Sequence, residues 1–265
     1  STHKMTSPIS AYLSVERSKD VIEGLFGLSA SKILAVRPSE QDLKDYGISD
    51  PIATLTLECE GGTSYTLNIG VVVTEADDIS TDDSTATTSA AATYYPVQLD
   101  DGNVIYAIAA DKCPWATITP TGLASKLIFT TYVWDISELD VTVDGKKTTF
   151  ENSGTDKDTA SITRDGKSEI DTERYRLFYA FLLQTAAEEV VLGDAPTGTP
   201  DAEIHYKTSD GSEDRTVAFY QIDDFNCYIT VNGELSFQCR ASYLDALRHN
   251  LEIFDTDEDF QTSWQ

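Results

Sequence analysis

Aromatic side chains offer the first chemistry that the sequence could support. Tyr94, Tyr95 and Trp115 flank a low-complexity run and the hairpin pattern that follows it. Rings exposed at such positions could stack on a sugar or on the surface of a partner, so we predict these three as ligand-binding residues. Core packing is the alternative, because Tyr106 on the same hairpin aligns with Phe237 in a second copy of the pattern.

Carboxylates are the second group, and two runs of aspartate could supply oxygen ligands to calcium. They are Asp77, Asp78, Asp82 and Asp83 in the low-complexity run, and Asp255, Asp257 and Asp259 near the carboxy-terminal end. Neither run has the glycine and the distal bidentate glutamate of a dedicated calcium loop. The pattern therefore favours solvated charge, and we predict no metal site; calcium binding by the first run stays open.

Catalytic motifs are absent from the sequence. It contains no GxSxG, HExxH, GxGxxG or Walker pattern, each of which would position a nucleophile, a metal or a phosphate. The three histidines are His3, His205 and His249, and surface or packing roles are commoner for such residues than membership of a triad. We therefore predict no catalytic residues, no cofactor and no enzymatic activity.

Cysteine chemistry is the third possibility. The four cysteines form no CxxC pair and have no histidine at metal-ligand spacing, which argues against a zinc site. Cys227 and Cys239 lie on the arms of a hairpin with Asn-Gly at its turn. A two-residue turn leaves them one position out of register, on opposite faces of the sheet, which favours buried free thiols. Another register would place them nearly opposite each other, so the disulfides Cys227–Cys239 and Cys59–Cys113 stay open.

The charge balance restricts the partners. The chain has 265 residues, with 19 Lys and Arg against 45 Asp and Glu, a net charge of −26. Such a field repels phosphate backbones and anionic lipid, so we expect no nucleic-acid partner and no membrane docking through charge. Hydrophobic residues make up 40 % of the chain, which is enough for a packed core.

An internal repeat organises the elements that must position these side chains. Residues 14–35 align without a gap with residues 171–192, and the strand pattern that begins at Thr54 recurs further along the chain. Self-similarity at a fixed offset is the mark of a repeated structural unit. We therefore predict two domains, the first repeat at 1–137 and the second at 138–265.

Each repeat is predicted to be one helix followed by an antiparallel β-meander. Caps at Ser14 and Asp171 are expected to open the two helices. The second repeat is expected to have strands at 202–208, 214–221, 226–231 and 234–240, and a final helix at 241–254. The predicted fold class is therefore α+β, a tandem duplication of a helix plus antiparallel β-meander unit, and not a doubly wound nucleotide fold.

Two features distinguish the first repeat from the second. A flexible acidic insert at 71–93, rich in Thr, Ser, Ala and Asp, interrupts its strands. The second repeat opens with a hairpin, centred on Asp144-Gly145, that the first almost lacks. We therefore expect an amino-terminal truncation, and the removed sequence could have held a signal peptide or a membrane anchor.

Five sequence passages, taken in order, resemble the domain-of-unknown-function 4340 family. They are LFGLSASKI, DLKDYGISDP, TLTLECEGGTSYTLNIG, TYYPVQLDDGNVIYAI and LIFTTYVWDISELDVTV. Members of that family are bacterial envelope proteins, often with an amino-terminal membrane segment, associated with ABC-type export systems of the gliding-motility kind. The resemblance implies an accessory module beside a transporter, and it supplies no site residues.

We therefore expect a non-catalytic, extracytoplasmic binding or assembly module with protein partners in an ABC-type membrane transport complex. It would lie in the cell envelope or be held at the membrane by an anchor outside this chain. One alternative is an envelope glycan hydrolase with a carboxylate pair in a cleft between the repeats. Another is a carbohydrate-binding surface adhesin with a wide apolar or aromatic patch. Whether a small molecule or a glycan binds stays open.

Overall fold

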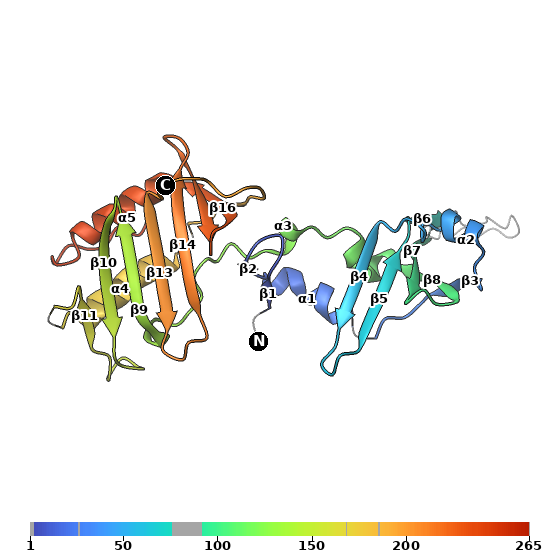
Figure 1. Ribbon diagram of the computed structural model, residues 1–265, viewed down its shortest axis with the longest axis horizontal. Coiled ribbons are helices and arrows are strands. Elements are labelled where there is room, and N and C mark those ends of the chain that lie inside the picture. Colours follow the sequence, from blue (N-terminus) through green and yellow to red (C-terminus); the bar gives the residue numbers. More distant parts are fainter. Residues whose placement is uncertain (1–2, 26, 76–91, 168, 185, 265) are drawn as a thin grey trace, which may run out of the picture. The chain divides into compact units, whose positions relative to one another are not determined.

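Antiparallel strands form most of the regular structure in a computed structural model of the protein (Figure 1). The structure describes residues 3–25, 27–75, 92–167, 169–184 and 186–264. Among these residues 37 % lie in strands and 21 % in helices, with three sheets and five helices. The predicted fold class, α+β with a tandem duplication of a helix plus antiparallel β-meander unit, is therefore wrong, and the fold is β-rich.

The shortness of the helices is the reason for this difference. The first three are α1 (Val15–Glu23), α2 (Glu40–Asp45) and α3 (Pro120–Leu123), with nine, six and four residues. Only α4 (Thr172–Leu183) and α5 (Ser242–Glu252) are longer, with 12 and 11 residues. Most remaining connections are hairpin turns, so strands outweigh helices within the described residues.

The chain divides into two compact units. Unit 1 comprises residues 1–15 and 120–265, and unit 2 comprises residues 16–119. The boundary predicted between residues 137 and 138 falls inside strand β9 (Ile136–Val143) of unit 1. That prediction concerned sequence repeats, whereas the units are defined by packing, so the repeat assignment stays a prediction.

Unit 1 is built on a sheet of eight strands in the order β11-β10-β9-β13-β14-β15-β16-β12. Besides β9, its strands are β10 (Lys146–Asn152), β11 (Ile162–Arg164), β12 (Glu189–Val190), β13 (Ala202–Thr208), β14 (Asp214–Gln221), β15 (Asn226–Val231) and β16 (Glu234–Arg240). A separate pair, β1 (Lys4–Met5) with β2 (Ala11–Tyr12), belongs to the same unit. The bounds of β13 to β16 confirm the four predicted strands.

The structure decides between the two registers considered for the β15–β16 hairpin. Asn232 and Gly233 have φ of 50° and 86°, as a two-residue hairpin turn of primed type requires. A bulge follows, because Ile229 pairs with Phe237 whereas Thr230 pairs with Leu235. The extra residue on β16 shifts the register by one position. Cys227 is therefore directly opposite Cys239, and both side chains lie on one face of the sheet.

Helices α4 and α5 cross one face of the unit 1 sheet (Figure 1). Asp171 caps α4, as predicted, by accepting a hydrogen bond from the Glu173 amide. The helices and the facing strands share a core of large aromatic side chains, each at most 1 % exposed. They are Phe150, Tyr175, Phe178, Tyr179, Phe181, Tyr206, Phe219, Phe237 and Tyr243. Alternation along β13 and β14 directs Tyr206 and Phe219 to the helices and leaves mostly polar residues on the other face.

Unit 2 has a smaller sheet in the order β3-β8-β7-β5-β4, with β6 paired to β7. Its strands are β3 (Lys32–Val36), β4 (Ala53–Glu58), β5 (Ser64–Ile69), β6 (Val73–Glu75), β7 (Ala92–Leu99) and β8 (Val104–Ala109). Two short 3-10 turns follow, η1 (Ala110–Lys112) and η2 (Pro114–Ala116). Val21 of α1 and Trp115 of η2 pack on one face of this sheet.

Part of the predicted flexible insert, 71–93, is regular structure. Strand β6 and the first residues of β7 pair with each other, for example Glu75 with Ala92. Residues 76–91, which include the four aspartates of the possible calcium site, lie outside the described residues. Among the described residues, no helix is long and apolar enough to cross a membrane.

Candidate functional site

An exposed row of apolar side chains crosses the unit 2 sheet, and we call it the apolar strip. It consists of Ile33, Val36, Tyr65 and Leu99, with exposed fractions of 60, 65, 43 and 42 %. Paired residues of antiparallel strands point to the same face. Ile33 pairs with Tyr106, which pairs in turn with Val97 on β7. Val36 pairs with Val104, two residues before Tyr106 on β8. Leu99, two residues after Val97, pairs with Leu67, and Tyr65 lies two residues before Leu67 on β5. The strip therefore lies on one face and crosses several strands.

The apolar strip continues the buried core of unit 2. Leu67 and Val97, which share its face, are 9 and 2 % exposed and pack with Trp115. Helix α1 and the η turns cover this inner part of the sheet, because Val21, Leu25 and Ala116 contact the core. Exposure rises from these residues outward to Leu99 and to the edge strand β3. The apolar face of this sheet therefore extends beyond the part that α1 and the η turns cover, and its outer residues stay exposed.

The three predicted ligand-binding residues are placed in the interior. Tyr94, Tyr95 and Trp115 are 6, 8 and 7 % exposed. Tyr95 and Trp115 belong to the unit 2 core, and the Trp115 Nε1 donates a hydrogen bond to the Val21 carbonyl over 3.1 Å. All three are therefore buried, which favours the core-packing alternative, and ligand binding by them stays a prediction. Burial raises the pKa of Tyr94, whose hydroxyl donates to Glu75 over 3.1 Å.

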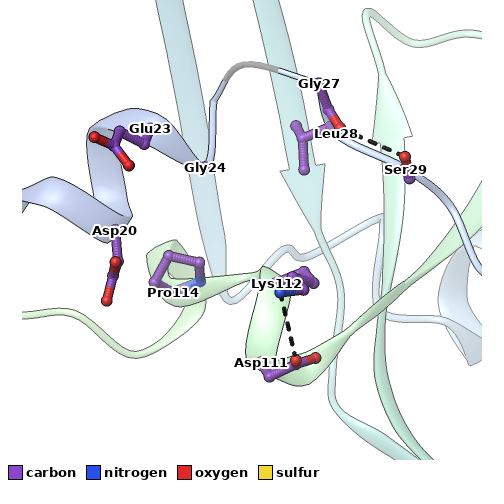
Figure 2. A pocket seen from close by; sticks show the side chains of 9 residues that line it. All are labelled: Asp20, Glu23, Gly24, Gly27, Leu28, Ser29, Asp111, Lys112 and Pro114. Carbon is purple, nitrogen blue, oxygen red and sulfur yellow. Dashed lines mark hydrogen bonds and ion pairs between the residues drawn. The ribbon is translucent and has the colours of Figure 1, made fainter.

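A shallow pocket of about 610 Å³ lies between the end of α1 and η1 in unit 2 (Figure 2). Its charged lining residues are Asp20 and Glu23 from α1 and Asp111 and Lys112 from η1. Lys112 Nζ lies 3.8 Å from Asp111 Oδ2, but these side chains are 72 and 74 % exposed. Such charges are largely hydrated, so no described residue that lines the pocket is a buried group that would select a ligand.

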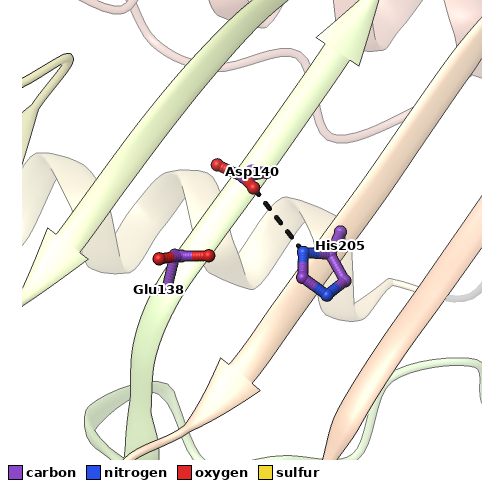
Figure 3. A group of neighbouring side chains, drawn as sticks. All are labelled: Glu138, Asp140 and His205. Atoms are coloured by element: carbon purple, nitrogen blue, oxygen red, sulfur yellow. Dashed lines mark ion pairs between the residues drawn. The ribbon is translucent and has the colours of Figure 1, made fainter.

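A histidine and two carboxylates meet on the polar face of the unit 1 sheet (Figure 3). Glu138 and Asp140 lie on β9, and His205 lies opposite Asp140 on β13. His205 Nδ1 is 3.5 Å from Asp140 Oδ2, and its Nε2 is 2.7 Å from Asp214 Oδ1. The donor atoms of the first three side chains all lie within 4.8 Å of one another, which is compact enough for a metal ion.

Cations of the protein already occupy this cluster. Lys147 Nζ is 2.7 Å from Asp140 Oδ2, and Lys207 Nζ is 3.3 Å from Glu138 Oε1. Burial disfavours the charge on Asp140, but the hydrogen bonds from Lys147 and Thr149 outweigh burial and lower its pKa. A metal ion would have to displace these lysines. The cluster therefore serves as an ion-pair ladder that joins β9, β10 and β13.

Sequence reasoning missed a second polar cluster, at the other surface of unit 1. The Glu213 carboxylate accepts hydrogen bonds from Tyr12 and, over 2.6 Å, from Thr131. These three residues line a pocket of about 600 Å³. Arg215 lies behind them, 5 % exposed, with its Cζ 4.7 Å from the centre of the Tyr12 ring. Its Nε and Nη2 have no hydrogen-bond partner in the structure.

The position of Arg215 could have been read from the alternation along β14. Arg215 shares its face with Val217 and Phe219, which are both fully buried, so the strand carries a charge on its apolar side. Burial opposes the charge on Glu213, yet the hydrogen bonds from Thr131 and Tyr12 lower its pKa. Glu213 and Arg215 thereby anchor the amino-terminal strand β2 to the sheet.

No family model, curated protein or solved structure matches the chain. The resemblance to the domain-of-unknown-function 4340 family stays a prediction. The geometry of the molecule therefore carries the functional argument, and the apolar strip is the exposed surface from which we argue.

Proposed function

We propose that the chain is a non-catalytic binding or assembly module that works outside the cytoplasm as an accessory of an ABC-type transporter complex. The apolar strip of unit 2 carries this proposal. Apolar surface left in water costs about 25 cal/mol per Å², and contiguous exposed patches mark the places where proteins dock. A partner seated on Ile33, Val36, Tyr65 and Leu99 would remove this surface from water.

The charge of unit 2 defines the chemistry of the partner. Residues 16–119 contain 6 Lys and Arg and 17 Asp and Glu, a net charge of −11. A complementary surface has an apolar centre that meets the strip and a basic rim that meets the surrounding acids. We therefore propose a protein subunit of the transporter with such a surface. The extracytoplasmic setting and the class of partner rest on the family resemblance, with any anchor outside this chain.

The enzyme alternative finds less support in the geometry than the binding proposal. A glycan hydrolase needs one carboxyl group that stays protonated to act as general acid. Asp140 is buried and Glu213 is half-buried in unit 1. Both carboxyl groups have pKa values below the usual range. Both are therefore ionised near neutral pH, which suits ion pairing and not proton donation.

The adhesin is the second candidate, because an exposed tyrosine can stack on a sugar ring. Tyr65 is 43 % exposed and lies within the apolar strip. An adhesin would bind isolated glycans through this ring without a protein partner. The same strip variants therefore distinguish the two functions.

Photo-crosslinking in the native host tests the proposal. A photoreactive amino acid replaces Leu99 in one variant and Thr56 in the control. Thr56 is exposed on β4 and points to the opposite face, because its partner Thr66 alternates with the buried Leu67. We expect a crosslink from position 99 to a transporter subunit, identified by mass spectrometry, and none from position 56. Equal crosslinking from both positions, or none from position 99, contradicts the proposal.

A binding assay separates the adhesin from the assembly module. Wild-type chain, Tyr65→Ala and the control Thr56→Ala are each applied to an array of envelope glycans. The assembly proposal expects no glycan signal that depends on Tyr65. A signal that Tyr65→Ala abolishes and Thr56→Ala preserves would favour the adhesin instead.

A further inference from the structure

The β15–β16 hairpin of unit 1 brings two cysteines into direct opposition. Cys227 and Cys239 are a Cα pair of the antiparallel ladder, two positions from the bulge at Ile229. All four cysteines of the chain are free thiols in the structure. Both Cys227 and Cys239 are fully buried and lie in the unit 1 core. Neither residue has a role in the functions discussed above.

The geometry of this pair suits a covalent bond. Directly opposed residues of antiparallel strands have Cα atoms about 4.5 or 5.5 Å apart, and disulfides span about 4.4 to 6.8 Å between Cα atoms. Their Cβ atoms lie about 4.5 to 5.5 Å apart, so closure requires an approach of at most about 1 Å. The two side chains also influence each other electrostatically: the neighbouring Cys239 lowers the pKa of Cys227, and the neighbouring Cys227 together with burial raises the pKa of Cys239.

The other two cysteines lack such an arrangement. Cys59 follows β4 in a turn, where its amide donates to the Thr63 carbonyl over 2.8 Å. Cys113 lies between η1 and η2, and burial raises its pKa to about 11, which keeps it a thiol near neutral pH. Neither residue is part of a strand pair. The structure therefore singles out one pair from the four cysteines.

We propose that Cys227 and Cys239 are a disulfide site, oxidised by thiol–disulfide exchange with a disulfide donor such as oxidised glutathione. One cysteine thiolate attacks a donor sulfur, which forms a mixed disulfide and releases one glutathione thiolate. The second cysteine thiolate then attacks its partner's sulfur, which forms the Cys227–Cys239 bond and releases the second glutathione. The two cysteine protons pass through solvent to the two glutathione thiolates, so two thiols are oxidised and one disulfide is reduced.

Burial determines when this bond forms. The donor cannot reach a pair that is 0 % exposed unless the hairpin opens, so exchange takes place during folding or during local opening. Once formed, the same burial shields the bond from reductants. The edge position of this hairpin favours local opening, because β12 pairs with only two residues of β16 and leaves the rest of β16 as a sheet edge.

The bond would stabilise the edge of the unit 1 sheet that β15 and β16 form. A covalent tie between β15 and β16 holds the last full-length strand of the sheet to its neighbour, and it keeps the register that the bulge sets. The inference rests on this geometry alone and does not depend on the proposed function.

Counting thiols after controlled refolding tests the proposal. The full chain is reduced, unfolded and refolded with either reduced or oxidised glutathione, and free thiols are then labelled with N-ethylmaleimide in denaturant. We expect four labels after reduced refolding and two after oxidised refolding by intact mass, with a linked peptide pair that contains Cys227 and Cys239. Four labels after oxidised refolding, or a link that includes Cys59 or Cys113, overturns the proposal.

Matched variants keep the count interpretable. The variant with both Cys59→Ala and Cys113→Ala should lose both remaining labels on oxidised refolding and retain two on reduced refolding. Cys227→Ala should keep three labels under both conditions. If refolding gives no soluble protein, the same count on chain exported to a bacterial periplasm decides the matter: two labels support the bond and four refute it.

Discussion

The two sheets share a strand path but differ in how they are covered. The path β13-β14-β15-β16-β12 of unit 1 and the path β4-β5-β7-β8-β3 of unit 2 connect their strands in the same order. Unit 1 adds β9, β10 and β11 at one edge, and two helices of 12 and 11 residues cover its apolar face. Unit 2 has the nine-residue α1, whose one fully buried residue is Ser18.

This difference shows that two sheets with the same strand order can leave different amounts of their apolar face exposed. In unit 1 the helices bring rings such as Phe178, Phe181 and Tyr243 onto the sheet, and these rings are at most 1 % exposed. In unit 2 the cover ends before Leu99, so the outer part of the apolar face remains exposed. The apolar face of one sheet is therefore covered, and the other sheet leaves apolar residues exposed, where we propose that a partner docks.

The largest expected effect is in the unit 1 core. Phe178 contacts the rings of Phe150, Phe181 and Phe254 at centroid distances of 5.7, 6.3 and 5.5 Å. Phe178→Ala should lower the free energy of unfolding of unit 1 by about 3 to 5 kcal/mol. The neighbouring Leu177, which is 42 % exposed, is the control. Denaturant unfolding followed by hydrogen-exchange mass spectrometry reports each unit separately, and an equal loss for Leu177→Ala would contradict the comparison.

The disulfide should have the next largest effect. For the loop closed by residues 227 and 239, the chain-entropy relation gives a stabilisation of about 3 kcal/mol. Oxidised chain with Cys59→Ala and Cys113→Ala should therefore unfold at higher denaturant in unit 1 than the same variant when reduced. Hydrogen exchange in unit 2 should be unchanged. A shift of equal size in both units would show that oxidation acts elsewhere.

The ion-pair ladder on the polar face of unit 1 should respond to pH. The folded-state pKa of Asp140 is lowered, so its contribution is present above the unfolded value of about 3.9 and is lost as pH falls through the folded pKa. Asp140→Asn should cost about 1 to 2 kcal/mol near pH 7 and nothing at the lowest pH where unit 1 stays folded.

A control on the same histidine checks this interpretation. Asp214 lies 2.7 Å from His205, but its side chain is 66 % exposed, so Asp214→Asn should cost less than Asp140→Asn. Urea unfolding of unit 1 between pH 3 and pH 7 measures both variants. A cost for Asp140→Asn that is constant across this range would mean that its ionisation does not contribute.

The smallest expected effect is on the stability of unit 2. Leu99 is 42 % exposed, so Leu99→Ser should change the free energy of unfolding by less than about 1 kcal/mol. The same variant should retain less of the proposed transporter subunit than wild type on co-purification from the native host, because we propose that the apolar strip acts in binding and not in folding. A loss of several kcal/mol in thermal unfolding of unit 2 would assign Leu99 to the core and weaken the proposed function.

Local pattern was sufficient to locate individual elements. Alternating apolar residues between turn signals predicted the strands 202–208, 214–221, 226–231 and 234–240 with the bounds that the structure has. The aromatic residues were harder, because Tyr94, Tyr95 and Trp115 carry no sign of burial in their own segment. Their rings are covered by distant residues such as Val21 and Glu75, which no local pattern reveals.

The sequence alone determined where strands and turns lie, because backbone preference and side-chain alternation act over a few neighbouring residues. It also determined the acidic field of the chain, from which we predict that nucleic acid is not a partner. Only the tertiary structure decided the register of β15 and β16, since one extra residue in a bulge moves Cys239 from one face to the other. It also decided which apolar face is covered, because burial depends on whether a helix from elsewhere in the chain reaches that face.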